Sequence, residues 1–271
     1  MENAVRFEKS SFAGRMKSML KVDFRRMFKS KFFYILIACA LVIPILMTVK
    51  MTMMDGSVSV DPQTGVETVI HGPENTWQSI GTLPTADGAA MGGMDVMAMC
   101  NINMMFMLVA VFICLFISDD FRSGYAKNLF TVRVKKGDYV ISKTLAGFVC
   151  GTFMLVFYFI GAMLGGAISG LSFDLGGLTV GNIVMCILSK IFLMLVFVAI
   201  FVLVSVAAKQ KAWLSICGSL GGGMLLFMMV GMITPLGSTI MNVLLCLAGG
   251  ALFAVGLGTI SKTVLKKTSL V

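Results

Sequence analysis

The sequence predicts an all-α, polytopic membrane protein, and three features lead to this fold class. Hydrophobic residues make up 58% of the 271 residues and charged residues only 13%, against about half and about a quarter in soluble proteins. Apolar runs close to the length of about 20 residues that crosses a bilayer core recur along the chain. Most Lys and Arg residues flank these runs. A soluble core cannot bury that much apolar surface.

Six apolar runs are long enough to be transmembrane helices. We expect them at residues 32–49, 100–117, 145–169, 191–208, 213–233 and 240–260. The expected organisation is a cytoplasmic N-terminus (1–31), a six-span domain (32–260) and a cytoplasmic tail (261–271). The basic stretch before residue 32 is too long for the n-region of a signal peptide, so we read the first run as a permanent helix.

The segment before the first span predicts an amphipathic helix at the membrane interface. Ser10 and Ser11 can cap a helix over residues 12–31, in which Phe and Met recur at helical spacing and Lys and Arg project elsewhere. Such a helix places its cations near anionic headgroups and its apolar stripe in the acyl boundary. A helix packed on a neighbouring part of the protein is the alternative.

The distribution of Lys and Arg predicts the orientation. These residues precede the first span, occur throughout the connection 118–144, and follow the fourth and sixth spans, whereas the loop 51–99 has neither and carries six acids. By the positive-inside rule both termini are cytoplasmic and the loop 51–99, with a small hairpin expected at 57–70, lies outside. The net charge of +9 is therefore a topology signal and predicts no nucleic-acid partner.

The sequence offers no pattern for catalysis or metal binding. It lacks the phosphate-loop, HExxH and GxSxG motifs, and no pair of acids lies within the predicted spans. His71 is the only histidine, and the seven cysteines have no CxxC spacing. We expect no catalytic residue and no metal site. The Met-rich stretch 91–107 is read as adaptable packing, with a route for Cu(I) as the alternative.

Two features of the later spans carry further expectations. Lys190 directly precedes the fourth predicted span, so we expect it to reach the outer interface and anchor the helix. If that span begins near Ile183 instead, the ammonium lies in hydrocarbon and marks a functional polar site. The pairs Gly161 with Gly165, and Gly166 with Gly170, have the GxxxG spacing that lets helices approach closely, within one chain or between two copies.

The connection between the second and third spans carries an ordered pattern. An acid at the end of the second span precedes Gly, Lys and Asn-Leu, and a basic stretch leads to Tyr-x-x-Ser-Lys. The residues concerned are Asp120, Gly124, Lys127, Asn128, Leu129, Arg133, Tyr139, Ser142 and Lys143. With six spans and both termini inside, nearly the whole chain resembles the permease subunit of ABC transporters of the type-2 exporter class. Asp120 replaces the more frequent Glu and Tyr125 the more frequent Thr, which leaves the subfamily and substrate open.

The resemblance implies a permease that forms a homodimer and binds two copies of a separate ATPase subunit. ATP and Mg²⁺ belong to that partner, so this chain is not itself an enzyme and holds no cofactor. Phe121, Tyr125 and Leu129 have the spacing of one helical face that can anchor in a pocket of the ATPase. The expected interface consists of Asp119, Asp120, Phe121, Arg122, Tyr125, Lys127, Asn128, Leu129 and Arg133. A merely solvated loop is the alternative.

Transport by such a permease would follow from rigid movement of helical bundles. We expect a largely apolar cavity from the second and fifth spans, with Met105, Phe112 and Phe227 as candidate lining residues. Such walls suit an amphipathic or hydrophobic cargo, and the leading hypothesis is a peptide of the bacteriocin or cytolytic type, exported or expelled for self-immunity, across a bacterial cytoplasmic membrane. Drugs, lipid-linked molecules and copper remain alternatives. A passive channel and a membrane scaffold or sensor are alternatives of another class.

Overall fold

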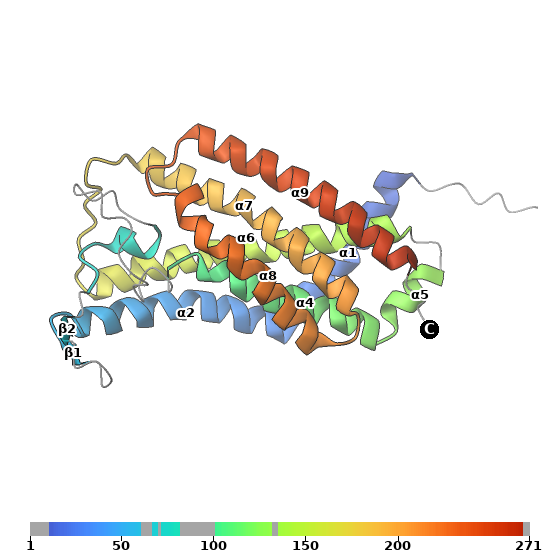
Figure 1. Cartoon of the computed structure of the whole chain (residues 1–271), viewed down its shortest axis with the longest axis horizontal. Coiled ribbons are helices and arrows are strands. Elements are labelled where there is room, and N and C mark those ends of the chain that lie inside the picture. Colours follow the sequence, from blue (N-terminus) through green and yellow to red (C-terminus); the bar gives the residue numbers. More distant parts are fainter. Residues whose placement is uncertain (1–10, 61–66, 70–71, 82–100, 132–134, 268–271) are drawn as a thin grey trace, which may run out of the picture.

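The structure is a bundle of long, roughly aligned helices with a small hairpin at one end (Figure 1). It is a computed structural model and describes residues 11–60, 67–69, 72–81, 101–131 and 135–267. Within these ranges six helices are long and apolar enough to cross a membrane, which confirms the predicted fold class. They are α2 (Lys31–Met53), α4 (Met104–Arg122), α6 (Lys136–Ile168), α7 (Val180–Ala208), α8 (Ala212–Ile233) and α9 (Ile240–Lys267).

Shorter elements mark the two ends of the bundle. Helices α1 (Phe12–Lys29) and α5 (Tyr125–Thr131) lie at one end, here called the α5 end (Figure 1). Strands β1 (Val58–Val60) and β2 (Glu67–Val69) and the 3₁₀ helix η1 (Thr76–Ser79) lie at the other, the hairpin end. The strands pair antiparallel with Val58 opposite Val69, so the predicted hairpin is confirmed.

Several helices extend beyond the apolar runs that predicted them. Helix α6 begins at Lys136 rather than at residue 145, and α7 begins at Val180 rather than at residue 191. The start of α7 is fixed by a capping box, in which Thr179 accepts from the backbone N–H of Asn182 and Asn182 bonds back to Thr179. Hydropathy detects only the apolar part of a helix, whereas capping decides where the helix begins.

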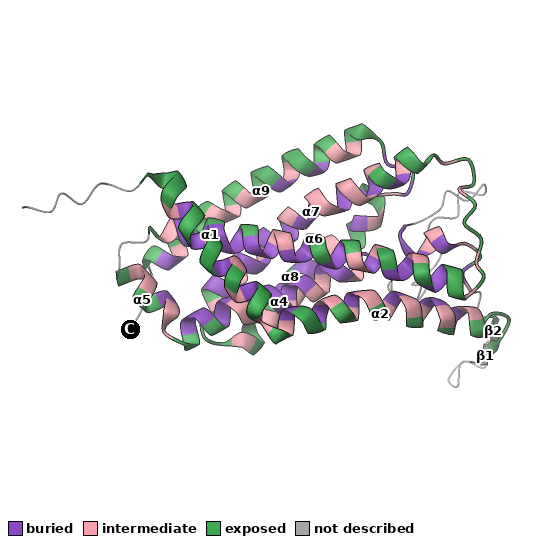
Figure 2. Ribbon diagram, turned by 180° about the vertical axis from the view of Figure 1, so that it is seen from behind, coloured by how far each residue is buried: buried purple, intermediate pink, exposed green. Residues whose placement is uncertain are grey.

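Helices α4, α6 and α7 form the buried centre, whereas α8 and α9 are largely exposed, as the green and pink residues of α9 show in Figure 2. Of the most apolar segment of α4, 61% is buried, against 17% in α8 and in α9. Large side chains such as Phe106, Tyr158, Phe197 and Phe201 fill the centre. The apolar side chains left exposed on α8 and α9 are suited to lipid or to another protein.

Glycines allow α2 and α6 to pack with their backbones nearly in contact. A Cβ on Gly161 would lie 2.2 Å from the carbonyl oxygen of Leu41, and one on Gly165 would lie 3.0 Å from Cα of Ile45. The GxxxG spacing thus joins two helices of the same chain, one of the two arrangements expected for it. Gly166 faces the side chain of Thr76 in η1.

Helix α1 forms as predicted, but its methionine stripe packs on the protein. Met16, Met19 and Met27 are buried, together with Asp23, on the side of α1 that contacts α6. Phe12 and Phe28 remain exposed. The alternative reading, a helix packed on a neighbour, therefore describes the methionine stripe, and this packing carries Asp23 into the interior.

Candidate functional site

The segment after the second span consists of two helices separated by a sharp turn. Helix α4 ends at Arg122, where the Ser123 hydroxyl donates to the carbonyl of Asp119 over 2.7 Å. Gly124 follows with φ of +74°, and α5 starts at Tyr125. A Cβ on Gly124 would meet no atom within 4 Å. Glycine is therefore favoured here by its backbone angle rather than by lack of space.

This turn corrects the expectation of one continuous helical face. Phe121 belongs to the end of α4, only 9% exposed, with its ring 6.5 Å from that of Tyr139. Leu129 in α5 packs against the core. The Tyr125 ring lies under the guanidinium of Arg26, with its centroid 4.4 Å from the guanidinium carbon. The three apolar side chains lie on two helices and turn toward the chain itself, because the left-handed residue at 124 ends the helical spacing.

Other polar residues predicted for the interface point outward, whereas Asp120, also predicted there, is fully buried. Arg122, Lys127 and Asn128 are exposed, while Ala126 between them is buried. We call the exposed set the α5 outer surface: Arg122, Ser123, Lys127, Asn128 and Thr131. Arg133, predicted as part of the interface, lies outside the described residues.

Beneath α5 a cluster of four buried or half-buried charges joins three helices. The Lys143 ammonium of α6 lies 2.7 Å from Oδ1 of Asp23 in α1 and 2.7 Å from Oδ2 of Asp120 in α4. Arg26 of α1 pairs with Oδ1 of Asp120. We call Asp23, Arg26, Asp120 and Lys143 the charged cluster. Its two acids and two bases balance.

Every carboxylate oxygen of the charged cluster accepts a hydrogen bond or an ion pair. On Asp120, Oδ1 accepts from Arg26, and Oδ2 accepts from Lys143 and, over 2.9 Å, from the hydroxyl of Tyr139. On Asp23, Oδ1 accepts from Lys143 and Oδ2 from the hydroxyl of Ser142. Buried charges are tolerated only when they are paired and hydrogen-bonded in this way.

Aromatic rings cover the two cations. The Lys143 ammonium lies 4.0 Å from the ring centroid of Phe116, and Arg26 lies between the rings of Phe116 and Tyr125. Burial disfavours the charge on Arg26, but Asp120 and Asp23 outweigh burial and raise the pKa of its guanidinium. Burial, reinforced by Asp23 and Asp120, also raises the pKa of the Tyr125 phenol. Arg26 stays charged and Tyr125 stays neutral near neutral pH.

The sequence pattern identified part of this cluster and missed part. Asp120, Tyr139, Ser142 and Lys143 were named and lie together in the structure. Asp119 reaches Arg26 only at the rim, over 3.7 Å. Asp23 and Arg26 were missed as site residues. A usable signal existed, because Asp23 is the only acid among the basic residues of α1, and a lone acid on a basic helix calls for a cationic partner.

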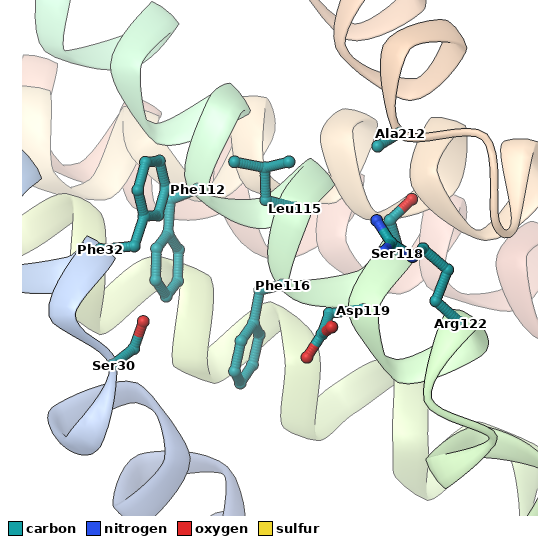
Figure 3. A pocket seen from close by; sticks show the side chains of 9 residues that line it. All are labelled: Ser30, Phe32, Phe112, Leu115, Phe116, Ser118, Asp119, Arg122 and Ala212. Atoms are coloured by element: carbon teal, nitrogen blue, oxygen red, sulfur yellow. The ribbon is translucent and has the colours of Figure 1, made fainter.

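A pocket of about 270 Å³ opens beside the charged cluster (Figure 3). The rings of Phe32, Phe112 and Phe116 gather on one side, and Asp119 and Arg122 lie on the other. Leu115, Ser30, Ser118 and Ala212 complete the lining. Of the predicted cavity residues Phe112 lines this pocket; Met105 is fully buried in the core, and Phe227 is half-buried on α8. Within the described ranges no His, Cys, Asp and Glu side chains group as a metal site would require.

The preferred reading of Lys190 is wrong. Because α7 begins at Val180, Lys190 lies three turns inside the helix and is fully buried. Its ammonium donates to Oδ1 of Asn103 over 2.7 Å and to the hydroxyl of Thr234 over 2.9 Å. Partners from two other parts of the chain, invisible to hydropathy, hold Lys190 in the interior.

Comparison with known proteins gives one result. The family model described as "ABC-2 family transporter protein" matches residues 19–224, which include the charged cluster, α5, the first four spans and the first part of α8. The chain belongs to this family. Neither curated proteins nor solved structures give a match. The family is one of membrane subunits of ABC transporters, which work with an ATP-binding subunit, so the recognition from the 118–144 connection is confirmed at this level.

Proposed function

We propose that this chain is the permease of an ATP-driven exporter, and that two copies work with two separate ATPase subunits by alternating access. The observation that carries the proposal is the charged cluster, which joins α1, α4 and α6 at the foot of α5. A force applied to α5 reaches the end of α4 through a two-residue turn and passes to α1 and α6 through four charges. Family membership supports the same role.

In this proposal the ATPase docks on the α5 outer surface. Lys127 and Asn128 are exposed there, whereas Phe121 and Leu129 are occupied within the chain. The partner would therefore recognise polar and basic groups rather than inserted apolar side chains. Lys136 supports α5 from behind, since its ammonium lies 5.9 Å from the ring of Phe130 and donates to the carbonyl of Leu265 in α9.

The proposed second permease copy meets the exposed face of α8. Trp213, Cys217, Gly221 and Leu225 recur on it every four residues and are exposed. Small residues among large apolar ones favour close contact between helices in a bilayer. In a twofold dimer, a residue near the axis meets its own copy. Oxidation should therefore cross-link two chains through Cys217, and Cys217→Ser should abolish the cross-link; an unchanged monomer would contradict this interface.

The proposed cargo is amphipathic, with a peptide of the toxin or bacteriocin type as the leading candidate. The pocket beside α4 supports this class, because it combines three phenylalanines with an acid and a base at its rim. The proposed orientation places the α5 end in the cytoplasm of a bacterial cell, so that the pocket opens at the inner membrane surface. Phe112→Ala should then weaken peptide-stimulated ATP hydrolysis without weakening ATPase binding.

The decisive experiment is co-purification of the full chain with a separately expressed ATPase, followed by ATP hydrolysis in liposomes with and without amphipathic peptides. The expected result is a stable complex whose ATPase rate responds to a peptide. The control is the double variant Lys127→Glu with Asn128→Ala, which should purify as a folded permease without the ATPase. Ion conductance from the chain alone would indicate a passive channel, and a complex that moves no cargo would indicate a scaffold.

A further inference from the structure

Lys190 is a fully buried charged residue that the proposed coupling does not use. It lies at the hairpin end of the bundle, about 15 Å along α7 from Val180 at 1.5 Å per residue. Its two hydrogen-bond partners stand at helix ends: Asn103 directly precedes α4, and Thr234 directly follows α8. One ammonium thus ties the hairpin ends of α4 and α8 to the interior of α7.

Both partners are directed toward this contact. Asn103 occupies the N-cap position of α4, where Asn normally accepts from its own helix, yet its side chain makes no capping bond and accepts from Lys190. The hydroxyl of Thr234 donates to the carbonyl of Val230 over 2.8 Å and so presents its lone pairs to Lys190. Cys186, one turn before Lys190, donates to the carbonyl of Thr234 over 3.5 Å.

The acceptors of Lys190 are neutral, which makes the contact reversible. Among the described residues no Asp or Glu pairs with Lys190. A buried ammonium with neutral acceptors is a costly way to hold a static bundle, for which an apolar side chain would serve better. It is well suited to opening, because entering water replaces the oxygens of Asn103 and Thr234 and no carboxylate is left unpaired.

We infer that Lys190, Asn103 and Thr234 form an outer latch, which holds the hairpin ends of α4 and α8 against α7 until ATP binding opens the path to the outside. This inference rests on the proposed exporter function. Lys190 acts as a positioning residue in the transport cycle. Opening the latch separates the ends of α4 and α8, and water then reaches Cys186.

Cys186 provides the reporter. The full chain, with Cys186 as its single cysteine and the other six replaced by Ala, is purified with its ATPase, placed in liposomes and exposed to a membrane-impermeant thiol reagent. Labelling is compared with and without Mg-ATP. The expected result is slow labelling without nucleotide and faster labelling with it. Equal labelling in both conditions, in a complex that hydrolyses ATP, would overturn the latch.

Two substitutions should move labelling in opposite directions. Lys190→Gln should raise labelling without nucleotide about tenfold or more, the effect of one charged hydrogen bond on a two-state equilibrium, and Lys190→Arg should restore much of the closure. Asn103→Asp should create an ion pair, lower labelling and abolish the increase with Mg-ATP while raising thermal stability. A residue with a purely structural role would gain stability from Asn103→Asp and keep its response to nucleotide, which would overturn the inference.

Matched controls separate the latch from general damage and from the exporter proposal. Lys50→Gln removes an exposed lysine at the hairpin end and should leave labelling unchanged. In the double variant Lys190→Gln with Asn103→Asp the protective effect of the new acid should disappear. If no ATPase co-purifies, the exporter proposal fails, although the variants still change basal labelling. If the ATPase binds and nucleotide raises labelling but the variants do not alter it, only the latch fails.

Discussion

The charged cluster at the α5 end and the outer latch at the hairpin end both bury a lysine, but they satisfy it differently. Lys143 lies between two carboxylates whose every oxygen is bonded. Among the described residues, Lys190 has an amide and a hydroxyl as its acceptors. Removing one member of the charged cluster leaves an opposite charge unpaired in the interior, whereas removing Lys190 leaves no charge unpaired. The charged cluster is therefore suited to a permanent contact, and the outer latch to a contact that opens.

The largest effect is expected from Lys143→Met. The change leaves Asp23 and Asp120 facing each other with only Arg26 for compensation, and breaking a buried ion pair from one side costs about 3–5 kcal/mol. Unfolding in mixed micelles, followed by Trp fluorescence, measures the loss. The triple variant Lys143→Met, Asp23→Leu, Ser142→Ala removes the stranded charge and should recover part of the stability. If the free energy of unfolding fell by less than about 1 kcal/mol, as for an ion pair on the surface, the charged cluster would not hold the three helices together.

A smaller effect is expected from Tyr139→Phe. This change removes one hydrogen bond to Asp120 and leaves the charges balanced, so the free energy of unfolding should fall by about 1.5–3 kcal/mol. The same unfolding assay compares it with Tyr34→Phe, whose ring is exposed on α2 and which should change little. Equal effects of the two variants would show that the phenol of Tyr139 does not support the cluster.

Lys190→Met should change the stability of the fold by only about 1 kcal/mol in either direction. The variant loses two hydrogen bonds but also the cost of burying an unpaired ammonium, and these terms oppose each other. Measured beside Lys143→Met in the same micelles, it tests the comparison directly. If the free energy of unfolding fell as much as in Lys143→Met, the outer latch would be a permanent structural contact that does not open.

The smallest effect on stability is expected from Lys127→Glu. The residue is exposed on the α5 outer surface, so the free energy of unfolding should stay within about 0.5 kcal/mol. Affinity for the ATPase should nevertheless fall, because the charge is reversed within the proposed contact. Titration of the ATPase onto immobilised permease measures the affinity, and Lys50→Glu at the other end of the bundle is the control. Equal affinities of the two variants would remove Lys127 from the interface.

Local sequence patterns predicted the spans and the hairpin, and the family pattern singled out Asp120, Tyr139 and Lys143 without predicting that they form a buried cluster. Hydropathy is a sum over neighbours in sequence, so it finds six helices well. Hydropathy could not predict that Lys190 lies in the interior, because its hydrogen-bond partners Asn103 and Thr234 are far away in sequence. The predicted helical face through Phe121 and Leu129 was wrong, because the positive φ of Gly124 ends one helix before the next begins. The glycine within the predicted helix was the sequence signal that could have indicated this break.

The contact of Gly161 with the backbone of Leu41 has a mechanical consequence. Helix α6 presents no side chain at Gly161, where the Leu41 carbonyl and the Pro44 ring of α2 lie against it, so the two helices are expected to resist sliding past each other. They are expected to tilt as one lever. Its arm at the α5 end is held by Lys143, and its arm at the hairpin end reaches η1, where Gly166 faces Thr76. In the proposed transport cycle, a displacement of this lever at the α5 end would therefore also move the hairpin end.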